Sequence, residues 1–161
     1  MTGSSLKCYL NRAPDAACTV YGNNEWIHCR AKGKSKNAFR IKTTVEAVAL
    51  ETDGDFRFPP ESEKSVCDWS VFTTKTFRGS YIELKGSDFN HAVEQLTSTI
   101  QYMKKEYNIV PVQAFIVISG SHLRNIQPSK ANAKLKFAKT FPGVTLNERT
   151  FGNTNSSDVI Q

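Results

Sequence analysis

An apolar stripe of helical period, followed by a continuous apolar run, most constrains what this sequence can fold into. Within 88–107 the apolar residues recur at spacings of three and four, which predicts an amphipathic helix of about five turns. The stripe consists of Phe89, Ala92, Val93, Leu96, Ile100, Met103 and Tyr107. Ser87 or Asp88 is the natural N-cap, and Pro111 lies just beyond the end. The run 112–118 is typical of a central strand covered on both faces.

Segments rich in β-branched and aromatic residues precede this helix. Segments 39–51, 66–72 and 80–85 are predicted as strands, although 44–50 could also form a short capped helix. The second and third strands are predicted to be antiparallel neighbours, because only the short connection 73–79 joins them. This arrangement of strands and helices predicts an α/β sandwich with a mixed sheet.

The length of 161 residues suits a single domain, 1–161. Within it we expect four regions, namely an irregular N-terminal part at 1–39, a core at 40–120, a basic helix and edge at 121–150, and a flexible tail at 151–161. The basic helix is predicted over 129–140, packed through Leu135 and Ala138.

Two features concern the cellular environment. The longest apolar run, 114–118, is far too short to span a membrane, and the N-terminus lacks a charged lead into an apolar stretch. We therefore expect a cytoplasmic protein with no membrane partner. The widely spaced cysteines contain no CxxC pair, so buried, reduced thiols are favoured over a zinc site. These cysteines are Cys8, Cys18, Cys29 and Cys67.

Basic residues cluster on both sides of an acidic middle, which extends from Glu46 to Asp68, and the formal net charge is +6. Two basic stretches suit a protein that grips a phosphate backbone, although lysine runs are often simply solvated faces. The candidate nucleic-acid-binding residues are Arg30, Lys32, Lys34, Lys36, Arg40, Lys42, Arg124, Lys130 and Lys134.

A candidate catalytic constellation combines Asp68 with the strand 80–85. Glu83 and Lys85 share one face of that strand, whereas Leu84 points to the other face and should seek the core. If Asp68 lies on the neighbouring strand, it brings a second carboxylate opposite them. Two carboxylates and an ammonium make sense around Mg²⁺, and such a site hydrolyses phosphodiesters. The alternative is an ordinary ion pair between Asp68 and Lys85, with Glu83 as a solvated acid.

The pattern of Asp68, fourteen residues and then Glu83-Leu84-Lys85 resembles the D…ExK signature of the PD-(D/E)xK nuclease superfamily, which includes restriction enzymes and Holliday-junction resolvases. The strand and the following helix, which carries Gln95, resemble the corresponding elements of small members. The resemblance covers about 40–120 and implies a restriction-endonuclease-like αβββαβ core, with a mixed central sheet flanked by helices.

The resemblance also implies roles for individual residues. The catalytic residues would be Asp68, Glu83, Lys85 and Gln95. The ligands of Mg²⁺, or of Mn²⁺ as its substitute, would be Asp68, Glu83 and the carbonyl of Leu84. An acid on an early helix often completes such a site, and the candidates here are Glu46, Glu51 and, more remotely, Glu25.

The expected function is therefore a metal-dependent nuclease acting on DNA, and analogy with small members suggests a homodimer. Phosphate contacts do not distinguish DNA from RNA, so RNA stays open as a substrate. The alternative is a catalytically weak or inactive nuclease-fold module that binds nucleic acid or a protein partner.

Overall fold

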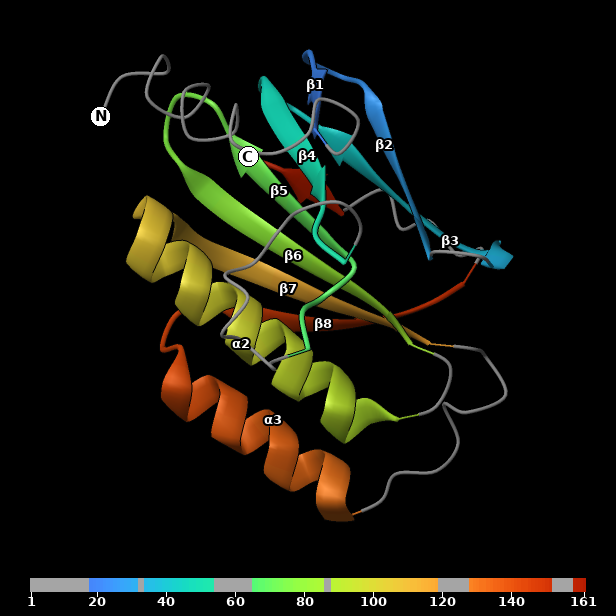
Figure 1. Cartoon of the computed structure of the whole chain (residues 1–161), viewed down its shortest axis with the longest axis vertical. Coiled ribbons are helices and arrows are strands. Elements are labelled where there is room, and N and C mark those ends of the chain that lie inside the picture. Colours follow the sequence, from blue (N-terminus) through green and yellow to red (C-terminus); the bar gives the residue numbers. More distant parts are fainter. Residues whose placement is uncertain (1–17, 32–33, 54–64, 86–87, 119–127, 152–157) are drawn as a thin grey trace.

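The computed structural model describes residues 18–31, 34–53, 65–85, 88–118, 128–151 and 158–161. These residues form a mixed α/β structure of two sheets and two helices (Figure 1). The larger sheet lies in the middle, both helices pack on one of its faces, and the smaller sheet covers the other. The described part therefore differs from a sheet flanked by helices, because β-strands cover the second face.

The larger sheet has six strands in the order β1-β4-β5-β6-β7-β8. Pairing is antiparallel from β1 to β6 and parallel from β6 to β8, so the sheet is mixed, as predicted. The predicted antiparallel pairing of the two central strands, β5 and β6, is confirmed. The bounds are Cys18–Tyr21 for β1, Ala47–Glu51 for β4, Trp69–Thr73 for β5, Arg78–Lys85 for β6, Val110–Ile118 for β7 and Thr145–Thr150 for β8.

The smaller sheet pairs β2 antiparallel to β3, and β3 parallel to β9. Its bounds are Trp26–Ala31 for β2, Lys34–Thr43 for β3 and Val159–Ile160 for β9. Two expectations differ from the structure where it describes them. Residues 18–31 and 34–39 of the N-terminal part contribute to regular strands, and Ile160 near the end of the sequence is buried in the core. The rest of the expected irregular part and tail, 1–17, 32–33 and 152–157, lies outside the described residues.

The segment 39–51, expected as one strand, contributes to two strands in different sheets, β3 and β4. The hydroxyl of Thr43 stabilises the break, since it donates to the carbonyl of Gly22 (2.6 Å) and accepts from the backbone N–H of Glu25 (3.1 Å). These partners precede Thr43 by 21 and 18 positions in the chain, so the local sequence pattern does not reveal the break.

Helix α2 spans Phe89–Tyr107 and confirms the predicted helix. Asp88 is its N-cap and accepts from the backbone N–H of His91 (3.0 Å), and Asn108 ends it with a φ of 55°. The buried side of α2 carries the predicted apolar stripe, which packs on the large sheet. Neither described helix is both long and apolar enough to cross a membrane.

Helix α3 spans Pro128–Thr140 and lies beside α2 (Figure 1). The helix was predicted, but the predicted packing through Leu135 and Ala138 is wrong. Leu135 is 55% exposed and Ala138 is also exposed, whereas Phe137 is 1% exposed and packs with Ala133 and Phe141. The packing residues lie four positions apart, so they share one side of the helix.

Both faces of the large sheet are buried, which changes the interpretation of β6. Tyr81 faces α2 and belongs to the core between the sheet and the helices. Ile82 and Leu84 belong to the second core, against the small sheet. Glu83 shares the face of Tyr81, so it points toward α2 and not toward solvent.

Candidate active site

The structure brings the carboxylates of Asp68 and Glu83 together. Asp68 lies at a bend just before β5, not on the strand as expected. Its Oδ2 accepts a hydrogen bond from the backbone N–H of Leu84 (2.7 Å), and its own backbone N–H donates to Oε2 of Glu83 (3.2 Å). The Asp68 carboxylate is therefore held by the backbone N–H of the residue after Glu83, and the Glu83 carboxylate is held by the backbone N–H of Asp68 itself. Both side chains lie at the same end of the β5–β6 pair.

Glu83 is a buried acid with only 2% of its surface exposed, and Asp68 is half-buried. Burial raises the pKa of the neighbouring Cys67 thiol to about 12, and the proximity of Glu83 and, more weakly, of Asp68 adds to this, against the opposing hydrogen bonds of Thr99 and Ser70. Two acids held together with so little water are costly unless cationic groups stabilise them. Positive charge beside the two acids would therefore stabilise them.

Two side chains of α2 hold the segment that leads into Asp68. Nε2 of Gln95 donates to the carbonyl of Val66 (2.9 Å), and Oγ1 of Thr99 accepts from the backbone N–H of Cys67 (2.9 Å). Gln95 was predicted to approach the site, and it does so through the backbone two residues before Asp68. Thr99 was missed, although a polar residue on the buried side of an apolar helix is a signal for such a role.

On the other side, Thr52, the residue that follows β4, fixes the backbone of Asp68. The carbonyl of Asp68 accepts from the backbone N–H of Thr52 (2.7 Å), and the hydroxyl of Thr52 bonds with that of Ser70 (2.9 Å). Thr52 and Ser70 are both buried. Asp68 is therefore anchored from α2, β4 and β6, which restricts its orientation.

Glu46, predicted as a further metal ligand, lies at the opposite end of the sheet. It precedes β4, whose first residue pairs with Thr73, and its Oε1 accepts from the hydroxyl of Thr74 (2.7 Å). Asp68 precedes the other end of β5, so the length of that strand, roughly 15 Å, separates the two acids. Glu46 is thus not a ligand shared with Asp68.

The other two acids considered also lie apart from the pair. Glu51 follows Ala47 and Ala49 along β4, and therefore faces the small sheet and not α2. Glu25 precedes β2, and its carboxylate accepts from the backbone N–H of Gly22 (2.7 Å). Among the described residues, no group of three or more His, Cys, Asp or Glu side chains could hold a metal ion.

The remaining oxygen of the expected ligand set is the carbonyl of Leu84. In a strand the N–H and C=O of one residue point to the same side, and the N–H of Leu84 points to Asp68. The Leu84 carbonyl therefore also faces the carboxylate pair. The backbone of Lys85 lies in β6 opposite Ile118, whereas its side chain lies outside the described residues.

The predicted basic residues fall into two groups. Lys130 and Lys134 on α3 both form ion pairs with Glu148 of β8, and both lie over the ring of Phe89, 5.0 Å and 5.9 Å from its centroid. Their charges are partly compensated, which weakens the prediction that they grip phosphate.

The second group lies on the small sheet, where Arg30 and Arg40 are exposed and Lys42 is half-buried. The indole N–H of Trp69 donates to the carbonyl of Arg30 (3.0 Å), so the end of β2 adjoins the residue that follows Asp68. The other basic residues predicted to bind nucleic acid lie outside the described residues, namely Lys32, Arg124 and the side chains of Lys34 and Lys36.

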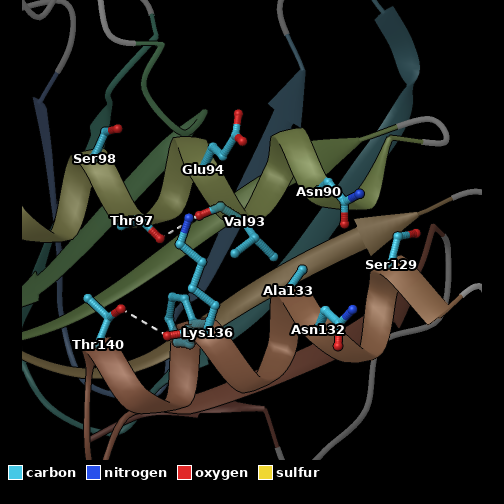
Figure 2. Close-up of a pocket in the computed structure, with 11 residues that line it drawn as sticks. Asn90, Val93, Glu94, Thr97, Ser98, Ser129, Asn132, Ala133, Lys136 and Thr140 are labelled. Carbon is cyan, nitrogen blue, oxygen red and sulfur yellow. Dashed lines mark hydrogen bonds between the residues drawn. The ribbon is translucent and has the colours of Figure 1, made fainter.

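Two surface hollows lie away from the carboxylate pair. One is a groove of about 470 Å³ between α2 and α3, in which Lys136 of α3 extends toward Thr97 of α2 (Figure 2). Its lining is mostly uncharged and polar. The other, of about 530 Å³, lies near Glu46, Lys75 and Arg78. Asp68 and Glu83 line neither of these two hollows.

Comparison of this chain with protein-family models, with curated proteins and with solved structures finds no match. Its function therefore has to be inferred from the chemistry of the Asp68–Glu83 pair and from the surfaces beside it.

Proposed function

We propose that this protein is a metal-dependent nuclease of the PD-(D/E)xK type, which hydrolyses phosphodiester bonds in DNA. The observation that carries the proposal is the pair of hydrogen bonds, from the backbone N–H of Asp68 to Glu83 and from that of Leu84 to Asp68, that brings the two acids together at one end of β5 and β6. The element order β4, β5, β6, α2, β7 supports it, because the expected core has the order βββαβ after its first helix.

The donor set suits a hard divalent cation. Mg²⁺ is bound by oxygen atoms and usually takes one or two carboxylates, with water and substrate phosphate completing its shell. A carboxylate accepts several hydrogen bonds or ligands, so the backbone contacts of Asp68 and Glu83 leave coordination possible. Asp68, Glu83 and the Leu84 carbonyl would hold the ion. The ion, when bound, supplies Lewis acidity and a more acidic water.

The protein's own residues would then position the reacting groups. Glu83 is held by burial, and the segment of Asp68 is held by Gln95 and Thr99, so little reorganisation is needed during the reaction. Lys85 follows on the same strand. By the resemblance it would orient the attacking water and offset the negative charge that grows on the phosphate.

A binding module is the second candidate, and one observation favours it. No third acidic ligand joins Asp68 and Glu83 among the described residues, which suits weak metal binding. Such a protein would hold nucleic acid or a protein partner without cleaving.

Conservative amide variants test the proposal. Labelled single-stranded, duplex and branched DNA, with RNA in parallel, are incubated with Mg²⁺ or Mn²⁺ and with EDTA. We expect the wild type to cleave only with metal, and Asp68→Asn, Glu83→Gln and Lys85→Ala to lose cleavage. The two amide variants keep a carbonyl oxygen for the backbone donors, so they should remain folded.

Glu46→Gln is the matched control, since it is the same chemical change at the other end of the sheet, where an amide oxygen can still accept from Thr74. It should cleave like the wild type. Binding of Mn²⁺, followed by electron paramagnetic resonance, should weaken in Glu83→Gln and not in the control. Cleavage that survives Lys85→Ala and Glu83→Gln would reject this site, and binding without cleavage by the wild type would favour the module.

A further inference from the structure

The outer face of the small sheet carries cations and an exposed aromatic ring. Its residues include Trp26, His28 and Arg30 from β2, and Arg40 and Lys42 from β3. The residues between them along β2 are buried against the large sheet, so this face points away from the core. We call it the ribbon face.

Within the part of the chain that the structure describes, the cations of the ribbon face form no ion pair with an acid. The segment 26–43 contains no Asp or Glu. Of the acids that precede its strands, Glu25 accepts from the backbone N–H of Gly22 (2.7 Å). Asp158, which is 3% exposed, binds Arg149 through Oδ2 and Nε (2.7 Å). The ribbon face therefore complements a polyanion.

Trp26 gives this surface a second property. Its side chain is 37% exposed, and the guanidinium of Arg40 lies 5.6 Å from its ring centroid. Lys42 is its direct cross-strand neighbour. An aromatic ring flanked by cations on a sheet is a platform on which nucleic-acid bases stack. In a duplex the bases are already stacked and paired, so only an unpaired base can use the ring.

We propose that the ribbon face binds single-stranded nucleic acid, with phosphates on Arg30, Arg40 and Lys42 and an unpaired base on Trp26. Only one part of this inference rests on the proposed function, namely the direction in which the bound nucleic-acid strand runs. Arg30 lies at the end of the ribbon face that is nearer to the candidate site, because its carbonyl accepts a hydrogen bond from the indole N–H of Trp69. From Trp26 to Arg30 the face extends for about 13 Å, so a bound strand leads toward Asp68.

Binding is measured by fluorescence anisotropy with labelled oligothymidine or oligouridine, and with a duplex of matched length, in EDTA so that cleavage cannot contribute. We expect the single strand, as DNA or RNA, to bind more tightly than the duplex. Tighter binding of the duplex, or no binding of a single strand, would overturn the proposal.

Two sets of variants locate the site. Arg30→Ala with Arg40→Ala should weaken binding and reduce the slope of log K against log salt by about 1.4, which is about 0.7 for each lost phosphate contact. The matched control, Lys104→Ala with Lys139→Ala, removes two exposed charges from the helices on the opposite side and should change neither quantity beyond its small effect on overall charge.

Trp26→Ala should weaken binding roughly 5- to 150-fold, whereas Trp26→Phe should retain most of it because a ring remains. The inference would be overturned if the Arg30/Arg40 double variant and the Lys104/Lys139 control lost the same amount of binding affinity. It would also be overturned if Trp26→Ala bound the single strand as tightly as the wild type. These outcomes are distinct from failure of the nuclease proposal. A chain that binds through the ribbon face without ever cleaving would reject only the nuclease, and a nuclease indifferent to ribbon variants would reject only this surface.

Discussion

Replacing Thr99 by Val should destabilise the protein by disturbing the segment that carries Asp68. The substitution keeps the shape and β-branching of the side chain and removes the hydroxyl that accepts from the backbone N–H of Cys67 (2.9 Å). Thr99 and Cys67 are both 0% exposed, so water has no ready access to the freed donor. The bond from this hydroxyl to the carbonyl of Gln95 matters less, because that carbonyl already lies within a helix.

The magnitude follows from the cost of one buried, unsatisfied backbone donor, about 1–3 kcal/mol. For a chain of this size, each kcal/mol lowers Tm by about 2–4 °C, so a loss of about 2 kcal/mol should lower Tm by about 4–8 °C. Thr99→Ser restores the hydroxyl and should recover most of the lost hydrogen-bond energy. Metal-dependent cleavage, if present, should fall in Thr99→Val and return in Thr99→Ser.

Thr97→Val is the matched control, because its hydroxyl donates to the carbonyl of Val93 in its own helix (2.7 Å) and its position is only half-buried (Figure 2). We expect its free energy of unfolding in urea to stay within about 0.5 kcal/mol of the wild type. Amide hydrogen exchange at Cys67 should accelerate in Thr99→Val alone. If the two Val variants are equally stable and Cys67 exchanges as in the wild type, α2 does not hold this segment as described.

Tyr81→Phe should raise the free energy of unfolding by about 1 kcal/mol, because among the described residues its buried hydroxyl has no hydrogen-bond partner; lower stability in urea would contradict this. Phe137→Ala should cost about 3–5 kcal/mol and Leu135→Ala less than about 0.5 kcal/mol, and comparable losses would show that α3 packs differently. Burial alone would raise the pKa of Glu148, but its two lysine partners lower it below the ordinary value of 4.5. Since the folded-state pKa is the lower one, the charge of Glu148 stabilises the fold above pH 4.5, and this is lost as pH falls through the folded pKa. Urea midpoints of the wild type and Glu148→Gln should therefore differ near neutral pH and converge in acid, and a constant difference would contradict the pairing.

The candidate site was only partly predictable. Asp68 and Glu83 were expected to meet because a short turn places their segments side by side, and that pairing depends on local sequence. The exclusion of Glu46 depends on the register of β4 against β5, which sequence spacing does not fix. The role of Thr99 depends on a contact with Cys67, thirty-two positions earlier in the chain.

The sequence by itself determined α2, β7 and the β5–β6 hairpin, because their hydrophobic periods and short turn are properties of neighbouring residues. Only the tertiary structure decided that 39–51 divides between two sheets, that α3 packs through Phe137, and that a second sheet covers the far face of β6. These outcomes depend on which surfaces are available to bury one another and on hydrogen bonds between distant segments. Both are set by the packing of the whole chain and not by any single stretch of it.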